Sequence, residues 1–277
     1  MTSSQPARRA FDWRNLGVRL ASAALLIPLA VLSVGFGGWL YLLTISVAVS
    51  LLAIEWGGMA APRTPIRTAV AVTAASLAGI FATRFISYPQ AWLVLLAGAA
   101  LTTVGFRNLT RRLTDVSAGV IYIGGPCLSL MWLRDGPAGL QWTALLLAAT
   151  WSADTAAFLV GNLLKGPKLQ PALSPKKTWS GLLGGLAGGT AAAAAAPALA
   201  PAVFDVGLSP MWLALTGLLI AAATMAGDLW ESFLKRRFGV KDSGDLIPGH
   251  GGLLDRVDGL LFAVLAAAAA RLAAQAG

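Results

Sequence analysis

Long apolar runs separated by short polar segments dominate this chain. The runs are about 20 residues long, which is the length that an α-helix needs to cross about 30 Å of hydrocarbon. The alternation of apolar and polar positions that a membrane β-barrel requires is not visible. The pattern therefore predicts an all-α, polytopic helical membrane protein, with residues 1–277 forming a single integral membrane domain. We expect about nine spans. Because several runs are short or interrupted by glycine, a count of about eight or ten is an alternative. Their approximate limits are 17–36, 39–58, 67–84, 91–106, 116–133, 140–160, 181–200, 210–229 and 254–274.

The distribution of Lys and Arg gives an orientation for these spans. If the N-terminus is cytoplasmic, the inner segments hold 18 of the 21 basic residues. Only Arg84, Arg134 and Arg271 fall on the outer side. Because basic residues remain on the cytoplasmic side, this asymmetry predicts a cytoplasmic N-terminus. The inner basic residues are Arg8, Arg9, Arg14, Arg19, Arg63, Arg67, Arg107, Arg111, Arg112, Lys165, Lys168, Lys176, Lys177, Lys235, Arg236, Arg237, Lys241 and Arg256.

Composition narrows the classes of function. Hydrophobic residues make up 57% of the chain and charged residues 12%, which excludes an ordinary soluble domain. The net charge of +9 is not arranged as a basic face with interleaved aromatic residues, so we expect no nucleic acid partner. Anionic lipid head groups or a phosphate substrate suit this charge better. The single cysteine, Cys127, is expected to be a small core residue, and the first span an uncleaved anchor.

The predicted inner loop 161–180 contains a candidate phosphate site. Lys176 and Lys177 lie beside the hydroxyl groups of Ser174 and Thr178, just before the next predicted span. Paired ammonium groups next to hydroxyl groups and a helix N-terminus favour phosphate binding. The alternative is that these lysines are ordinary basic residues of a cytoplasmic loop.

Two features inside the spans also stand out. Asp154 lies in the predicted span 140–160, where a carboxylate faces a polar cavity or a partner charge, or else caps a break in the helix. Small residues repeat every four positions over 181–189, which predicts close packing between helices.

The second inner loop, 230–254, and its flanks hold the densest group of ionisable residues. The spacing of Asp228, Glu231, Ser232 and Lys235 places them on one face of a helix leaving the membrane. Asp255 and Asp258 are three residues apart at the start of the last predicted span, again on one helical face. Between the two groups, His250 lies in a glycine-rich turn that can approach a ligand closely.

This group of residues favours Mg²⁺ over zinc, because it has several carboxylates, no cysteine and one histidine. Lys235, Arg236, Lys241 and Arg256 are then placed to neutralise phosphate charge, as phosphoryl or nucleotidyl transfer requires. The alternative is a salt-bridged surface loop.

In these positions the chain resembles the signature of the phosphatidate cytidylyltransferases, also called CDP-diacylglycerol synthases. The upstream Ser174–Thr178 segment, the acidic turn at Asp154 and the nine-span layout resemble that family as well, while Ser180 departs from the Glu that the family commonly has there. The matching signature residues are Ser232, Lys235, Arg236, Lys241, Asp242, His250, Gly251, Gly252, Asp255, Arg256 and Asp258.

The resemblance implies a reaction in which CTP and phosphatidate give CDP-diacylglycerol and pyrophosphate. It also implies a divalent metal site held by Asp228 and Asp255, with potassium as a candidate second ion. Lys176, Lys177, Lys235 and Arg236 are then expected to bind substrate phosphates, with Ser174 and Ser232 as candidate hydrogen-bond donors. His250 is either an acid, a base or a phosphate contact, or a residue that fixes the loop.

The expected setting is the cytoplasmic face of a bacterial inner membrane, with the bilayer, CTP and phosphatidate as partners and a homodimer as a candidate state. Two other functions compete with this interpretation. A transporter or channel with a cytoplasmic charged gate would use Asp154 and Asp228 in its pathway. An enzyme that moves a phosphoalcohol onto a CDP-lipid would need its own aspartate-rich helical motif, which is absent.

Overall fold

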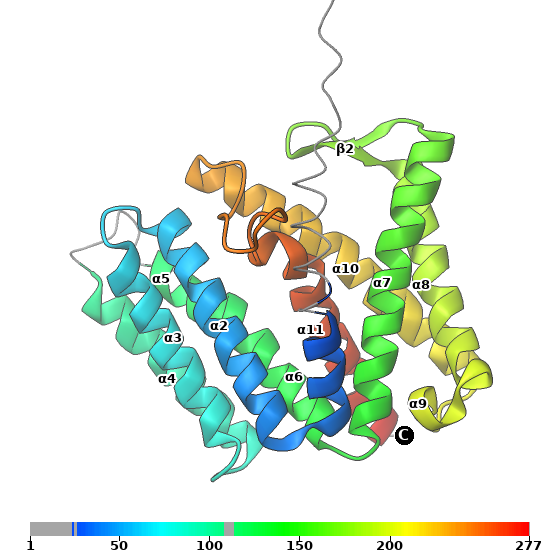
Figure 1. The fold of residues 1–277 in the computed structure, drawn as a ribbon, viewed down its shortest axis with the longest axis horizontal. Coiled ribbons are helices and arrows are strands. Elements are labelled where there is room, and N and C mark those ends of the chain that lie inside the picture. The colour runs from blue at the N-terminus through cyan, green and yellow to red at the C-terminus, as the bar shows by residue number, and fades with distance from the viewer. Residues whose placement is uncertain (1–23, 25–26, 108–113, 277) are drawn as a thin grey trace, which may run out of the picture.

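The computed structural model describes residues 24, 27–107 and 114–276, and in this part the chain is a bundle of long apolar helices (Figure 1). Within those residues, seven helices are long and apolar enough to cross a membrane. The all-α, polytopic membrane fold is therefore confirmed. The seven are α2 (Gly38–Ala60), α3 (Pro65–Ala82), the run from α5 (Thr114–Gly119) through the π-helix η1 (Val120–Gly124) to α6 (Gly125–Asp135), α7 (Gly139–Leu164), α8 (Trp179–Leu199), α10 (Pro210–Phe238) and α11 (Leu254–Ala276).

The predicted count of nine spans stays a prediction. The predicted span 91–106 corresponds to α4 (Tyr88–Gly105), a helix of 18 residues. The first predicted span is described only in part, as a short apolar helix over Ile27–Phe36. The rest of that span, and the basic residues that precede it, lie outside the described residues.

Helix α10 continues past residue 229, where the sequence predicted the span to end, and reaches Phe238. Lys235, Arg236 and Arg237 lie in its last turn, where positive charge offsets the exposed carbonyl dipoles. Gly239 ends the helix in the left-handed conformation, with φ of 76°. The extension carries the acidic and basic face, which the sequence predicted to be helical, as a continuation of the span.

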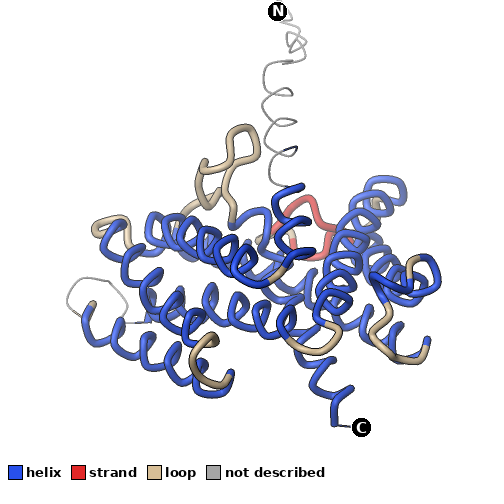
Figure 2. Tube along the Cα trace, turned by 60° about the horizontal axis from the view of Figure 1, so that its bottom comes forward, coloured by secondary structure: helices blue, strands red, loops and turns tan. Residues whose placement is uncertain are grey.

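The segment after α7 folds as a β-hairpin, which the sequence did not predict. Strand β1 (Lys168–Gln170) pairs antiparallel with β2 (Ser174–Thr178). Both strands are too short to show an alternating pattern, so the sequence suggested only a turned loop. The side chain of Thr178 then accepts a hydrogen bond from the Gly181 backbone N–H at 3.1 Å and caps the start of α8. Figure 2 shows the two strands in red against an otherwise helical chain.

The helices form two groups that meet at α11. Helices α2 to α6 pack together on one side, and α7, α8 and α10 lie on the other (Figure 1). Helix α11 contacts α6, α7 and α10 and so joins the two groups. Trp56 of α2 strengthens this junction by packing against Tyr122 of η1 and Phe238 of α10. A short helix, α9 (Pro201–Phe204), lies in the connection between α8 and α10.

Glycines allow α7 and α8 to approach closely, as their four-residue spacing predicted. A Cβ atom on Gly185 would lie 3.1 Å from the carbonyl oxygen of Ala153, and one on Gly189 would lie 3.1 Å from that of Ala149. A Cβ atom on Gly188 would collide with Ala156. The predicted packing role of this segment is confirmed.

The three arginines predicted for the outer side gather at one end of the bundle, near the end of α6. Arg84 pairs with Asp135 at 3.1 Å, and Arg134 lies in the last turn of α6. Arg271, only 1% exposed, donates to backbone carbonyls at the end of α6 and just beyond it. These residues close the end of the bundle opposite to the hairpin and to the loop that follows α10.

Candidate active site

A cavity of about 510 Å³ opens between α7, the hairpin, α8, α10 and the start of α11. It joins the two regions that the sequence singled out, because both contribute to its wall. The predicted site residues that line it are Lys176, Lys177, Thr178, Asp228, Ser232, Lys235, Asp255, Arg256 and Asp258. Asp154 and Glu231 line it as well.

Lys177 and Asp228 connect the hairpin to α10. The Nζ atom of Lys177 lies 2.9 Å from Oδ2 of Asp228, and both side chains are partly buried. Asp154, on α7, lines the same cavity. The cavity wall thus combines the ammonium group of Lys177 with acids from two helices, α7 and α10.

Two glycines bring α10 and α11 into contact beside these acids. A Cβ atom on Gly227 would lie 3.1 Å from Cα of Gly259 and 2.5 Å from the carbonyl oxygen of Asp258. A Cβ atom on Gly259 would lie 3.1 Å from Oδ1 of Asp228. Because each helix has a glycine at the crossing, Asp228 and Asp258 lie next to each other in the cavity wall.

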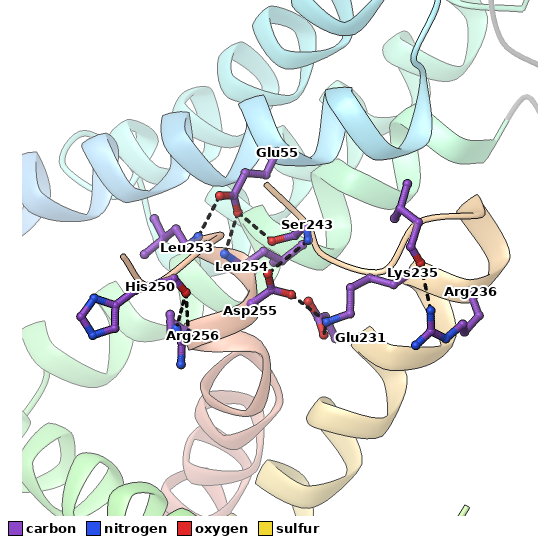
Figure 3. A network of polar contacts seen from close by, with 11 residues as sticks. Glu55, Glu231, Lys235, Arg236, Ser243, His250, Leu253, Leu254, Asp255 and Arg256 are labelled. Carbon is purple, nitrogen blue, oxygen red and sulfur yellow. Dashed lines mark hydrogen bonds and ion pairs between the residues drawn. The ribbon is translucent and has the colours of Figure 1, made fainter. Parts of the chain in front are cut away.

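Lys235 bridges two further acids. Its Nζ atom lies 2.5 Å from Oε2 of Glu231, one turn earlier on α10, and 2.7 Å from Oδ1 of Asp255 on α11. Oδ2 of Asp255 accepts a hydrogen bond from the backbone N–H of Ser243 at 3.1 Å. Glu231 is buried, and its Oε1 atom has no hydrogen-bond partner among the described residues. Figure 3 shows this network spanning α10, the loop and α11.

Four predicted site residues do not line the cavity. Ser174 is in β2, while Arg236 and Lys241 are exposed at and just after the end of α10. The backbone carbonyl of His250 accepts hydrogen bonds from the guanidinium group of Arg256, and the imidazole ring points away from the acids in Figure 3. Catalytic or binding roles for these four residues stay predictions.

Glu55 is a polar residue of this region that the sequence did not place in the site. It lies near the end of α2, and its carboxylate reaches Ser243, the last residue before α11 and the first residue of that helix. Nothing in the spacing along the chain links residue 55 to the region around residue 250.

The donor atoms around the cavity suit a hard cation. Carboxylates and hydroxyl groups line it, and none of the residues in its wall is a cysteine or a histidine. Among the described residues, no group of three or more His, Cys, Asp or Glu side chains is placed to hold a metal by itself. Mg²⁺ fits such a wall, because it takes one or two carboxylates and completes its shell with water and substrate phosphates.

Comparison with known proteins places these residues in a family. Residues 17–273 match the model of the cytidylyltransferase family. The chain belongs to this family. The match covers both cavity-forming regions and confirms the resemblance seen in the sequence motifs.

Several curated relatives carry the name phosphatidate cytidylyltransferase. The proteins from Brucella suis biovar 1 (strain 1330) and Brucella melitensis biotype 1 are each 39% identical over 182 residues, which is 62% of this chain and 66% of theirs. The protein from Rickettsia conorii is 34% identical over 175 residues, which is 62% of this chain and 76% of that protein. The alignment with the Brucella relatives thus spans just under two thirds of their length.

Proposed function

We propose that this protein transfers the cytidylyl group of CTP to phosphatidate, giving CDP-diacylglycerol and pyrophosphate. The observation that carries the proposal is the cavity in which Lys176, Lys177 and Lys235 meet Asp228 and Asp255. This cavity lies between the ends of membrane-spanning helices, where a diacyl lipid and a soluble nucleotide can meet. The names of the bacterial relatives support the same reaction.

The proposed chemistry is a direct transfer. A phosphate oxygen of phosphatidate attacks the α-phosphorus of CTP and forms a new P–O bond. The bond from the α-phosphorus to the bridging oxygen breaks, and its electron pair leaves with pyrophosphate. No nucleophilic side chain is needed, because a phosphate monoester is largely ionised near pH 7. Lys177 and Lys235 bring the two anionic substrates together and offset their charge. Catalysis then comes from this positioning and charge compensation.

We propose Asp228 and Asp255 as the residues that hold Mg²⁺, with potassium as a second ion. When bound, the metal ion would offset the negative charge around the α-phosphorus of the transferred cytidylyl group. Lys177 and Lys235 each contact one of these acids and keep the carboxylates facing the cavity. Thr178 and Ser232, also in the wall, supply hydroxyl groups for phosphate oxygens.

The proposed location is the cytoplasmic face of a bacterial inner membrane. The Lys and Arg distribution puts both cavity-forming loops on the inner side, where CTP is available. A transporter or channel, the main alternative from the sequence, is not favoured, because the relatives are named as cytidylyltransferases.

Purified protein in detergent, supplied with radiolabelled CTP and phosphatidate, tests the proposal. We expect label to enter the lipid phase only when phosphatidate and Mg²⁺ are both present. Lys177→Met should lower this transfer roughly ten- to hundredfold, since a hydrogen bond to a charged group contributes about 1.5–3 kcal/mol. Lys168→Met is the matched control, because Lys168 is exposed in the same hairpin and does not line the cavity. Wild-type protein that leaves all label in the aqueous phase would refute the proposed reaction.

A further inference from the structure

Glu55 is a buried acid in the group of helices that contributes nothing to the cavity wall. It lies on α2, only 3% exposed. A carboxylate in such a position is costly unless its oxygens are hydrogen-bonded. The partners of Glu55 come from a distant part of the chain, the loop before α11 and the first residue of that helix (Figure 3).

The carboxylate caps the N-terminus of α11. Oε1 accepts a hydrogen bond from the backbone N–H of Leu253, and Oε2 accepts one from that of Leu254, each at 2.7 Å. These N–H groups have no partner inside the helix, and the helix dipole favours negative charge there. Glu55 thus does from another helix what a local capping residue does in most helices.

The same carboxylate also holds Ser243. The hydroxyl group of Ser243 donates to Oε2 of Glu55 at 3.3 Å, while its backbone N–H donates to Oδ2 of Asp255 at 3.1 Å. Asp255 is therefore fixed twice through Glu55. The first residue of α11 donates its backbone N–H to the carboxylate of Glu55. The Oδ2 atom of Asp255 accepts a hydrogen bond from Ser243, which itself donates to Glu55.

Two glycines leave room for this arrangement. A Cβ atom on Gly244 would lie 3.1 Å from Cγ of Glu55. One on Gly252 would lie 3.0 Å from Oε1 of Glu55 and 2.9 Å from Oδ2 of Asp255, and it would collide with the hydroxyl group of Ser243. Any larger residue at position 252 would separate the two acids from Ser243.

We propose that Glu55 is a positioning residue, which from α2 holds Ser243 and the first turn of α11 so that the Asp255 carboxylate faces Lys235 and the cavity. This inference rests on the proposed function, in which Asp255 takes part in binding Mg²⁺. It extends the site to helices α2 to α6, whose described residues do not line the cavity.

Steady-state kinetics of the full chain in detergent, with Glu55→Gln, test the proposal. The amide keeps the size of the side chain but offers an NH₂ group to backbone donors that need an acceptor. Mutation of a group that supports a metal ligand typically lowers metal affinity or activity about 10–100-fold. We therefore expect the Mg²⁺ concentration for half-maximal activity to rise at least about tenfold, with little change in the KM for phosphatidate. Glu55→Asp keeps the carboxylate and should recover part of the Mg²⁺ response.

Asp115→Asn is the matched control. Asp115 is another buried acid between the helix groups, and its carboxylate pairs with the guanidinium group of Arg237 on α10. We expect it to lower the unfolding temperature without shifting the Mg²⁺ response. An equal shift in both variants would show that Glu55 acts only through general stability, and no shift in Glu55→Gln would overturn the proposal.

Hydrogen exchange without Mg²⁺ or substrates separates this inference from the proposed function. The amides of Ser243 and Leu254 should exchange faster in Glu55→Gln than in wild-type protein, while those in the middle of α11 should not change. Unchanged exchange at Ser243 and Leu254 would overturn the positioning role even if the wild-type protein transferred no cytidylyl group. Wild-type protein without transfer activity but with the expected exchange pattern would refute only the proposed reaction.

Discussion

The ammonium group of Lys235 offsets the repulsion between acids of α10 and α11. This group lies between Glu231 and Asp255, and the Lys235 side chain is only 15% exposed. Glu231 is more buried still, with a side chain 2% exposed. Removing one member of a buried ion pair lowers stability far more than replacing the whole pair by apolar residues, because the remaining charge is left without a compensating charge.

Lys235→Met should therefore lower stability and abolish activity together. We expect a loss of about 3 kcal/mol, at the lower end of the range for breaking a buried ion pair, because Lys235 and Asp255 are partly exposed. Chemical denaturation in detergent, followed by tryptophan fluorescence, would measure it. Adding Glu231→Gln should restore part of the stability but none of the activity. Wild-type stability in Lys235→Met alone would mean that the bridge is energetically neutral.

The sequence could predict the residues of this bridge but not their support. Glu231, Ser232 and Lys235 follow helical spacing, so a reader of the sequence can place them on one face. Asp255 is visible for the same reason, as the first of two acids one turn apart. Glu55 follows no such rule, because its partners are 188 to 199 residues away and the contact depends on how the helices pack.

At the scale of elements, the crossing of α10 and α11 determines the shape of the cavity. The crossing is close because Gly227 and Gly259 face each other. Two aspartates that the chain separates by a whole loop thereby become neighbours in one wall. A change at the crossing should therefore affect the chemistry without touching any charged residue.

Gly227→Ala should lower both stability and cytidylyl transfer. Its Cβ atom would push against the backbone of α11 and separate Asp228 from Asp258, and overpacking of this kind typically costs about 1–3 kcal/mol. Gly58→Ala is the control, because a Cβ atom at that helical position meets nothing within 4 Å and alanine favours a helix by about 1 kcal/mol. Transfer assays and thermal unfolding on both variants would check this. Full activity in Gly227→Ala would show that the crossing can widen without effect.

The long helices were predictable because each corresponds to a long run of apolar residues. Apart from the C-terminal extension of α10, the limits of those that are fully described lie within a few residues of the predicted ones. The hairpin was not predictable. Its strands have three and five residues and pair mainly with each other, so no pattern of burial marks them. The charged end of α10 was seen as a helical face, but its continuity with the span depends on favourable charge in the last turn.

At the scale of the whole molecule, the two ends of the bundle differ in chemistry. One end carries the cavity, the hairpin and the loop before α11, and the other carries the arginines around the end of α6. The Lys and Arg distribution in the sequence predicts that the cavity end faces the cytoplasm, and this orientation stays a prediction.

Labelling of introduced cysteines would test this orientation. In a Cys127→Ala background, Lys241→Cys places a thiol in the exposed loop at the cavity end, and Phe85→Cys places one in the exposed turn between α3 and α4. A membrane-impermeant thiol reagent should label Phe85→Cys in intact cells, and Lys241→Cys only after the cells are opened. The reverse pattern would place the cavity on the outer side.

The capping of α11 by Glu55 also constrains how the protein is made. Helix α2 leaves the ribosome early, and the amides that satisfy its carboxylate follow only 198 and 199 residues later. Through most of synthesis, therefore, this acid must be kept near water or held by a neutral contact. Only when the first turn of α11 reaches it can the cavity take its final form, so the site is completed near the end of translation. A chain that stalls before residue 254 would insert most of its helices and still have no site.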